Sequence, residues 1–185
     1  MGRLVLVVGG ARSGKSKYAV SRAAEEAPSG RVAFVATAIP SDEEMRLRVE
    51  KHRRARPEGW ETFEEPLHPD RLALDLVRRF EAVVLDCLTL WLFNWFERLR
   101  GGSALELRRA LEGRAVALSS NLRRAADSGG ATIIVVSNEV GMGVVPPDPH
   151  DRAFCDALGR LNQSVAERAD EVILVCCGVP VRIKP

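Results

Sequence analysis

The sequence is poor in cysteine, and its cysteines are not spaced as a metal site or a disulfide framework requires. The 185 residues include four, Cys87, Cys155, Cys176 and Cys177, and no C-x-x-C pair occurs among them. Zinc sites and small disulfide-stabilised domains are usually recognised by such paired spacings. We therefore expect buried free thiols in a reducing compartment rather than a zinc site or a disulfide scaffold.

Long hydrophobic runs and an excess of one charge are also missing. No apolar run is long enough to cross a bilayer, and no signal-like hydrophobic segment with a cleavage site follows Met1-Gly2-Arg3. The 27 basic residues nearly balance the 25 acidic ones, for a net charge of +2, which is too small to favour general binding to nucleic acid or membranes. We expect a cytoplasmic protein without nucleic-acid or membrane partners, in which any basic site is local.

The composition and the order of apolar segments predict one α/β domain over residues 1–185. The chain is 46% hydrophobic and 28% charged, without repeats, low-complexity segments or linkers. Apolar runs predict strands at 4–8, 32–35, 83–85, 132–136 and 172–175, and helical patterns lie between them at 15–26, 42–54, 71–80, 104–127 and 151–168. This alternation predicts a three-layer fold with a mostly parallel sheet and helices on both faces. Residues 181–183 follow the previous strand too closely for a crossover, so we expect an antiparallel hairpin at the edge.

A glycine-rich motif follows the first predicted strand and precedes a predicted helix. Its residues, Gly9-Gly10-Ala11-Arg12-Ser13-Gly14-Lys15-Ser16, match G-x-x-x-x-G-K-[ST]. In such a loop, backbone N–H groups surround a phosphate, the lysine reaches the β- and γ-phosphate oxygens and the serine holds Mg²⁺. We therefore predict nucleoside triphosphate binding and a P-loop NTPase-like fold, the alternative being a glycine turn without a ligand.

Asp86 is the candidate acidic partner of the phosphate loop. It ends the apolar run Ala82-Val83-Val84-Leu85, as the metal-binding aspartate of a P-loop enzyme does. The same position suits the N-cap of a helix that starts near Cys87. The phosphate loop favours a Mg²⁺ site that is formed by Ser16 and Asp86.

One of the three histidines, His52, lies in a basic helical segment. Met45, Val49 and His52 are spaced i, i+4 and i+7, which places the histidine on the apolar face. Arg53, Arg54 and Arg56 follow it and could hold a phosphate against the imidazole. The alternative is a half-buried histidine on a solvated basic helix. His68 and His150 are interpreted as ordinary surface residues.

The segment 137–147 follows the predicted strand 132–136, where ligands bind in open α/β sheets. Gly141 and Gly143 would let the backbone approach a ligand. The alternative is a long connection that makes no ligand contact.

Several motifs, in this order along the chain, resemble one enzyme family. They are the phosphate loop, Thr37, the run Arg48-x-x-x-His52-x-x-x-Arg56-Pro57-x-x-Trp60-x-Thr62-x-Glu64, Asp86-Cys-Leu-Thr-x-Trp91, Asn138-Glu-Val-Gly-Met-Gly-Val-Val-Pro146 and Ile183-Lys184. From Leu4 to Lys184 the chain resembles the bifunctional adenosylcobinamide kinases / adenosylcobinamide-phosphate guanylyltransferases of cobalamin synthesis.

The resemblance implies two reactions that use ATP, GTP and Mg²⁺. The hydroxyl group of adenosylcobinamide is phosphorylated, and GMP is then transferred from GTP to that phosphate through a guanylylated histidine, which His52 matches. Lys51 precedes it where some relatives carry a second histidine, so this run holds one candidate nucleophile. With Lys15 and His52 as catalytic residues, the nucleotide site implied comprises Gly9, Gly10, Ala11, Arg12, Ser13, Gly14, Lys15, Ser16, Ala36, Thr37, Ala38, Arg53, Arg54, Ala55, Arg56, Glu64 and Asp86.

The family also implies a homotrimer. Trp91, Phe93, Trp95 and Phe96 form either a subunit contact or a buried amphipathic helix. Two other functions stay open: a P-loop kinase with a single activity on a small molecule, and a nucleotide-binding ATPase or switch protein. Neither explains His52, because neither needs a covalent GMP intermediate.

Overall fold

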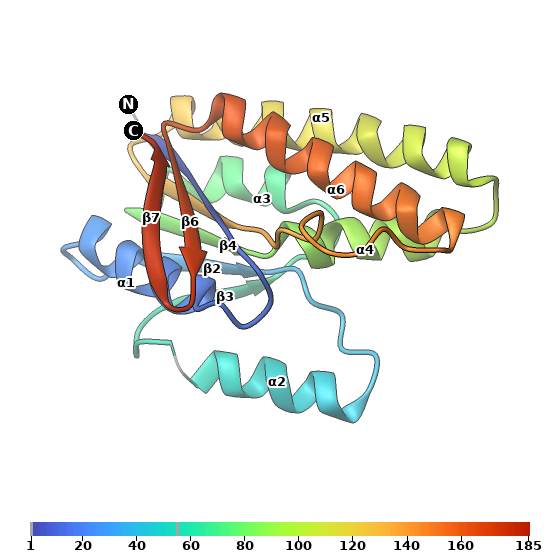
Figure 1. The fold of residues 1–185 in the computed structure, drawn as a ribbon. Coiled ribbons are helices and arrows are strands. Elements are labelled where there is room, and N and C mark those ends of the chain that lie inside the picture. The colour runs from blue at the N-terminus through green and yellow to red at the C-terminus, as the bar shows by residue number, and fades with distance from the viewer. Residues whose placement is uncertain (1, 55) are drawn as a thin grey trace.

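The computed structural model describes residues 2–54 and 56–185, which form a seven-stranded sheet and the helices around it (Figure 1). The strands are β1 (Arg3–Val8), β2 (Val32–Ala36), β3 (Glu61–Glu64), β4 (Ala82–Asp86), β5 (Thr132–Val136), β6 (Glu171–Cys176) and β7 (Val179–Lys184). The helices are α1 (Lys15–Glu26), α2 (Glu43–Arg54), α3 (Pro69–Leu76), α4 (Leu88–Leu99), α5 (Ala104–Ser128) and α6 (Pro149–Arg168).

The sheet has the strand order β3-β2-β4-β5-β1-β6-β7. Every neighbouring pair is parallel except β6 and β7, which form an antiparallel hairpin at the edge. The predicted mostly parallel sheet and its closing hairpin are therefore confirmed. Since parallel strands end at the same edge, the carboxyl ends of β1, β2, β4 and β5 lie together there.

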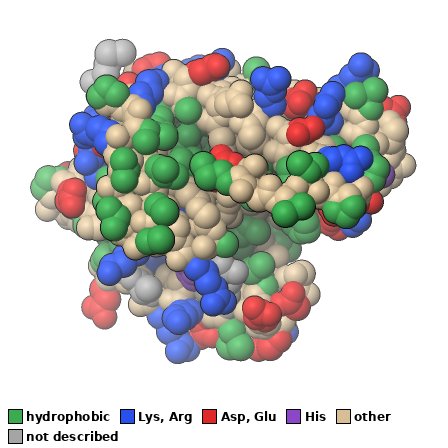
Figure 2. All heavy atoms as spheres, viewed as in Figure 1, with side chains coloured by type: hydrophobic (Ala, Val, Ile, Leu, Met, Phe, Trp, Pro, Cys, Tyr) green, Lys and Arg blue, Asp and Glu red, His purple; other side chains and the backbone are tan. Residues whose placement is uncertain are grey.

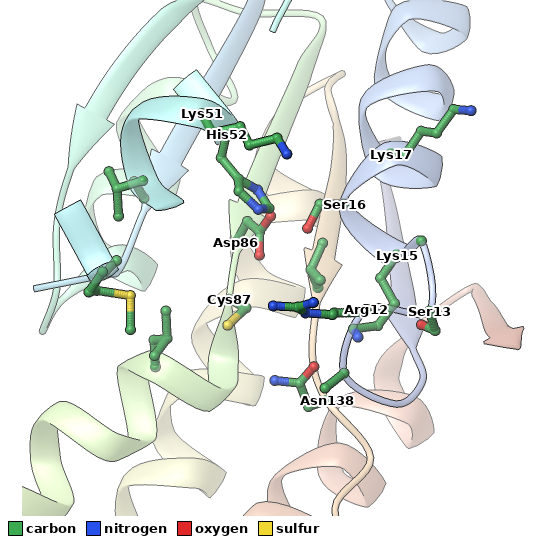
Figure 3. A pocket seen from close by; sticks show the side chains of 18 of the residues that line it. Arg12, Ser13, Lys15, Ser16, Lys17, Lys51, His52, Asp86, Cys87 and Asn138 are labelled. Carbon is green, nitrogen blue, oxygen red and sulfur yellow. The ribbon is translucent and has the colours of Figure 1, made fainter. Parts of the chain in front are cut away.

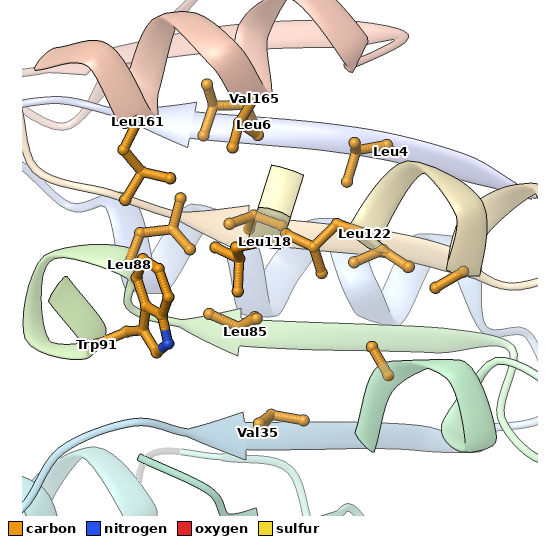
Figure 4. Close-up of a cluster of buried hydrophobic side chains, with 14 of the residues drawn as sticks. Leu4, Leu6, Val35, Leu85, Leu88, Trp91, Leu118, Leu122, Leu161 and Val165 are labelled. Atoms are coloured by element: carbon orange, nitrogen blue, oxygen red, sulfur yellow. The ribbon is translucent and has the colours of Figure 1, made fainter. Parts of the chain in front are cut away.

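The two faces of the sheet form two apolar layers. Leu4 and Leu6 of β1 pack with α5 and α6 on one face, whereas Val5 and Val7 pack with α1 on the other. Side chains alternate between the faces along a strand, so continuous apolar runs fill both layers. Figure 4 shows the thicker layer, where Leu118 and other leucines of the long helices meet the sheet. Helices cover both faces as predicted.

Helix α2 differs from the other helices because it stands apart from the sheet, on the side of α1 (Figure 1). None of its described side chains is fully buried. Charged residues make up most of this helix, and Met45 and Val49 form a half-buried stripe along it. The helix is positioned to border a site rather than to build the core.

Three expectations from the sequence are wrong, and the alternative left open for the aromatic residues of α4 is resolved for two of them. The edge strand β3 was not predicted, and α3 ends at Leu76 instead of residue 80. Trp91 and Phe96 are buried on the inner face of α4, so the amphipathic-helix interpretation holds for them and a subunit contact does not. Cys87 is buried as expected, but Cys176 and Cys177 are exposed because they lie at the end of β6 and in the turn of the edge hairpin. Among the described residues, no helix has both the length and the apolar character needed to cross a membrane.

Candidate functional site

The phosphate loop connects β1 to α1 and has the backbone conformation that its glycines permit. Gly14 has a φ of 100°, in the left-handed region that glycine adopts without steric cost. A Cβ atom at Gly9 would lie 2.2 Å from the carbonyl oxygen of Val175, so only glycine fits where the loop meets β6. Lys15 Nζ donates to the carbonyl oxygen of Gly10 at 2.6 Å, which holds the ammonium group over the loop. The loop thus has the conformation that a phosphate cradle requires.

A cavity of about 830 Å³ opens beside this loop. The phosphate loop and the start of α1 form one wall, α2 forms the opposite wall, and the ends of β2, β4 and β5 form the floor (Figure 3). Its size is within the range of small-ligand pockets. In Figure 2, Lys and Arg side chains gather on the α2 part of the molecule, below the hollowed surface. The site therefore combines a phosphate cradle with a basic rim.

Asp86 lies at the floor of the cavity, at the end of β4. Ser16 donates a hydrogen bond to its carboxylate, and the two side chains point toward each other in Figure 3. Burial raises the pKa of the Asp86 carboxyl group above its ordinary value, and the Ser16 hydrogen bond and the charges of His52, Arg56 and Lys15 oppose this shift. The N-cap of α4 is Cys87, so the capping interpretation of Asp86 is wrong.

The hydroxyl group of Ser16 and the carboxylate of Asp86 are hard oxygen donors of the kind that Mg²⁺ prefers. Within the described part of the chain, no group of three or more His, Cys, Asp or Glu side chains could hold a metal ion. Beside a nucleotide, Mg²⁺ takes one or two protein ligands and completes its shell with phosphate and water. The donor set thus suits Mg²⁺ accompanied by a nucleotide and does not suit zinc.

His52 lies on the α2 wall, and its ring is next to the carboxylate of Asp86 in Figure 3. Met45 and Val49 line the cavity on the same face of α2. The i, i+4, i+7 spacing therefore predicted the correct face, although this face borders the cavity instead of a packed core. Lys51 also lines the cavity. An imidazole in this position can reach a phosphate group that is bound in the cavity.

Arg56 is the one arginine of the basic run that the structure brings into the cavity lining, among the described residues. Its guanidinium carbon lies 3.6 Å from the centroid of the Phe34 ring, and its Nη1 donates to Thr62 Oγ1 at 2.8 Å. Burial lowers the pKa of Arg56 below its ordinary value, and the carboxylate of Asp86 opposes this shift. Stacking and the hydrogen bond fix the planar group beside the cavity.

Other predicted nucleotide residues lie outside the cavity lining. Arg53 and Arg54 are exposed on α2, and Arg54 forms an ion pair with Glu50. Glu64 is exposed at the end of β3. Ala36 and Ala38 line the cavity, whereas Gly9, Gly10 and Thr37 do not. Ala55 lies outside the described residues.

Thr37 is fully buried and supports the floor of the cavity. Its Oγ1 donates to the carbonyl oxygen of Cys87 at 2.7 Å and accepts from the Cys87 N–H at 2.9 Å. Asn94 of α4 donates to the carbonyl oxygens of Thr37 at 2.8 Å and Pro66 at 3.0 Å. These bonds tie the ends of β2 and β4 together and thereby position Asp86. Sequence reasoning missed Asn94, because a single asparagine between aromatic residues carries no local signal.

The loop after β5 begins at the site and then leaves it. Glu139 N–H donates to the carbonyl oxygen of Gly9 at 3.0 Å, and Asn138 lines the cavity. Farther along, Met142 is 82% exposed and Val144 is 95% exposed. The prediction that this segment reaches the ligand site is supported for its first residues. The tip of the loop presents an apolar surface to solvent.

Comparisons with known proteins agree with this geometry. Residues 5–183 match the family described as cobinamide kinase / cobinamide phosphate guanyltransferase. The bifunctional adenosylcobalamin biosynthesis protein CobU of Escherichia coli (strain K12) is 38% identical over 183 residues, which cover 98% of this chain and 99% of the relative. The corresponding protein CobP of Pseudomonas aeruginosa is 40% identical over 189 residues, with coverage of 97% and 96%.

A solved structure supports the fold alone. The ATPase domain of G40P superposes with a TM-score of 0.52 at 13% identity, covering 93% of this chain and 68% of that one. The P-loop NTPase-like architecture is thus confirmed, and the resemblance drawn from the motifs is confirmed by the family match. The chain belongs to the cobinamide kinase / cobinamide phosphate guanyltransferase family.

Proposed function

We propose that this protein phosphorylates adenosylcobinamide with a nucleoside triphosphate and then transfers GMP from GTP to the resulting phosphate, through a covalent intermediate on His52. The observation that carries this proposal is that His52 shares one cavity with the phosphate loop and Asp86. A phosphate cradle alone would serve any P-loop kinase. A histidine on the facing wall adds the nucleophile that a nucleotidyl transfer requires.

The phosphoryl transfer uses the phosphate loop. Backbone N–H groups and Lys15 hold the β- and γ-phosphates, and the substrate hydroxyl oxygen attacks the γ-phosphorus while the nucleoside diphosphate leaves. Ser16 and Asp86 would hold Mg²⁺, which when bound neutralises charge on the phosphates. The carboxylate of Asp86 suits this role because it lies at the floor of the cavity, where a bound cation would favour its charged form. The β- and γ-phosphates are common to ATP and GTP, so the phosphate loop does not distinguish between them.

The guanylyl transfer uses His52. A ring nitrogen attacks the α-phosphorus of GTP, pyrophosphate leaves, and a phosphoramidate with GMP forms. The phosphate oxygen of the phosphorylated cobinamide then attacks the same phosphorus and the imidazole leaves. Arg56, which is fixed against Phe34 and Thr62, can neutralise charge on the transferring group. Arg53 and Arg54 are proposed to assist only at the rim, because both are exposed.

The chain has three histidines, which makes the assignment of His52 directly testable. Wild type, His52→Ala and, as the matched control, His68→Ala are incubated with GTP and Mg²⁺ and weighed intact by mass spectrometry. His68 is not among the residues that line the cavity, and its ring lies edge-on to Trp95, with ring centroids 5.8 Å apart. We expect a GMP adduct on wild type and on His68→Ala and none on His52→Ala.

The kinase rate is measured on the same proteins. His52→Ala should keep most of its phosphoryl transfer, since that step needs the phosphate loop but no histidine adduct. An adduct that persists on His52→Ala, or that maps to His68 or His150 in wild type, contradicts the proposal. Loss of both activities together, with a lower unfolding midpoint, would assign His52 a structural role.

We also propose a homotrimer and a cytoplasmic location. The trimer is supported by the family resemblance and by exposed apolar side chains such as Met142 and Val144, since the buried Trp91 and Phe96 no longer support it. Light scattering after size exclusion should give three times the 20.3 kDa chain mass, and a monomeric mass contradicts this. The location rests on composition, and cell fractionation tests it.

A further inference from the structure

Two adjacent exposed cysteines lie where β6 turns into β7, and the second of them, Cys177, has an unusual backbone conformation. Cys177 and Gly178 have φ values of 52° and 83°, and the flanking residues Cys176 and Val179 are paired across the hairpin. Two positive φ values in a two-residue hairpin loop are typical of Asn-Gly or Gly-Gly sequences. A cysteine in the left-handed region is uncommon and carries a steric cost. Local turn preferences therefore do not explain Cys177.

The two thiols are close to each other. Cys176 Sγ donates to Cys177 Sγ at 3.8 Å, and both side chains are open to solvent. Adjacent exposed thiols can react together with one reagent, whereas a buried cysteine such as Cys87 is protected. The pair is thus available to small solutes.

This turn is also bound to the phosphate loop. Gly178 N–H donates to the carbonyl oxygen of Ser13 at 2.9 Å. A Cβ atom at Gly14 would lie 3.4 Å from Gly178 Cα, so the turn packs against the loop at van der Waals distance. One residue before the pair, the carbonyl oxygen of Val175 lies against Gly9. The cysteines are therefore next to residues that shape the phosphate cradle, although they lie about 160 positions later in the chain.

We propose that Cys176 and Cys177 form an oxidisable dithiol, and that its closure to a disulfide withdraws the Gly178 amide from the phosphate loop and weakens nucleotide binding. The oxidant is a low-molecular-weight disulfide. One cysteine thiolate attacks it, forming a mixed disulfide and releasing one small thiol; the second cysteine then attacks the mixed disulfide, which forms the Cys176–Cys177 bond and releases the second small thiol. Two protein thiols are oxidised, and one small disulfide is reduced to two thiols.

Closure of this ring must deform the turn. The sulfur atoms have to approach from 3.8 Å to about 2.05 Å, the length of a disulfide bond. Consecutive Cα atoms are about 3.8 Å apart across a trans peptide, which is shorter than the usual Cα separation of bridged cysteines. The peptide between the cysteines therefore distorts, and Gly178 is the next residue. A strained, exposed disulfide is easily reduced, which suits a reversible switch and not a permanent brace.

The test measures disulfide formation and nucleotide affinity, so it does not depend on the proposed two-step reaction. Only an effect of the disulfide on catalysis would rest on the proposed function. The full-length protein is treated with oxidised glutathione, digested and analysed for a peptide in which Cys176 and Cys177 are linked. Affinity for a fluorescent GTP analogue is measured before oxidation, after oxidation and after reduction with dithiothreitol. We expect the linked peptide, a roughly fivefold rise in Kd as for the loss of one hydrogen bond, and recovery on reduction.

Three variants control the experiment. Cys176→Ser and Cys177→Ser should bind the nucleotide like reduced wild type and should no longer lose affinity on oxidation. Cys155→Ser, in the half-buried cysteine of α6, should respond like wild type. The inference is overturned if the two cysteines carry only separate glutathione adducts, if the linked peptide forms without a change in Kd, or if Cys177→Ser still responds. None of these readouts requires GMP transfer, so a failure of the His52 assignment would leave this result intact.

Discussion

The hydroxyl group of Thr37 offers a quantitative test of how the floor of the site is held. Replacing Thr37 by valine keeps the size and branching of the side chain and exchanges Oγ1 for a methyl group. Both hydrogen bonds to the backbone of Cys87 are lost. Because Thr37 is fully buried, water cannot replace them.

The two lost bonds differ in their effect. The carbonyl oxygen of Cys87 still accepts from the Trp91 N–H at 3.1 Å, so it keeps one partner. Losing the bond from Thr37 Oγ1 to this oxygen therefore costs about 1 kcal/mol, as for one ordinary hydrogen bond. The Cys87 N–H has no second partner in the described part of the chain, and an orphaned buried donor costs about 1–3 kcal/mol. We expect Thr37→Val to lower the free energy of unfolding by about 2–4 kcal/mol. The free energy of unfolding of a typical domain is about 5–15 kcal/mol, so we expect the variant to fold.

Urea unfolding followed by circular dichroism measures this change, with Thr37→Ser as the matched control. The serine variant keeps the hydroxyl group and loses one buried methyl group, about 1 kcal/mol. The role of the two hydrogen bonds is refuted if the free energy of unfolding of Thr37→Val lies within about 0.5 kcal/mol of the wild-type value while its dependence on urea concentration is unchanged. Because Cys87 follows Asp86, we also expect folded Thr37→Val to require more Mg²⁺ for phosphoryl transfer than Thr37→Ser does.

Three further predictions concern charged residues. Lys15→Ala should abolish phosphoryl transfer and weaken nucleotide binding without loss of helical signal, because this ammonium serves the β- and γ-phosphates; a near-normal rate in a coupled kinase assay contradicts this. Asp86→Asn should raise the Mg²⁺ midpoint of the kinase reaction, and equal midpoints in a magnesium titration would exclude Asp86 as a ligand. Burial raises the pKa of Asp170, but the Leu4 N–H and the Arg123 guanidinium lower it more, so the folded pKa lies below the ordinary value. The stabilisation is then present above about pH 4 and is lost as the pH falls through the folded pKa. The urea midpoints of wild type and Asp170→Asn should therefore differ at about pH 7, and the difference should shrink as the pH falls below about 4; a difference that stays constant contradicts this.

Local sequence signals predicted the elements whose residues are buried on both sides. The continuous apolar runs of β1 and β5 identify central strands, because no polar position interrupts a strand that is covered on both faces. The strand β3 has no such run, since it lies at the edge, pairs only with β2 and reads Glu-Thr-Phe-Glu. An edge strand is recognised by its partner rather than by its composition.

The arginines after His52 show where sequence proximity misleads. Arg53 and Arg54 directly follow the histidine, but each residue of a helix is rotated by about 100° from the one before, and neither arginine lines the cavity. Arg56 follows the end of α2 and reaches the site because the chain turns toward β3, where Thr62 and Phe34 receive its side chain. Only the tertiary structure separates these three arginines.

By itself, the sequence determined the phosphate loop and most of the strands and helices, with the exception of the edge strand β3. These features depend on neighbours within a few residues: glycine conformations, an apolar run and the spacing of one helix face. The tertiary structure decided which distant residues share the cavity. His52 lies beside Asp86 because α2 stands away from the sheet, and the Cys176–Cys177 turn touches the phosphate loop because β6 pairs with β1. Strand order is set by packing over the whole chain, so no local pattern contains it.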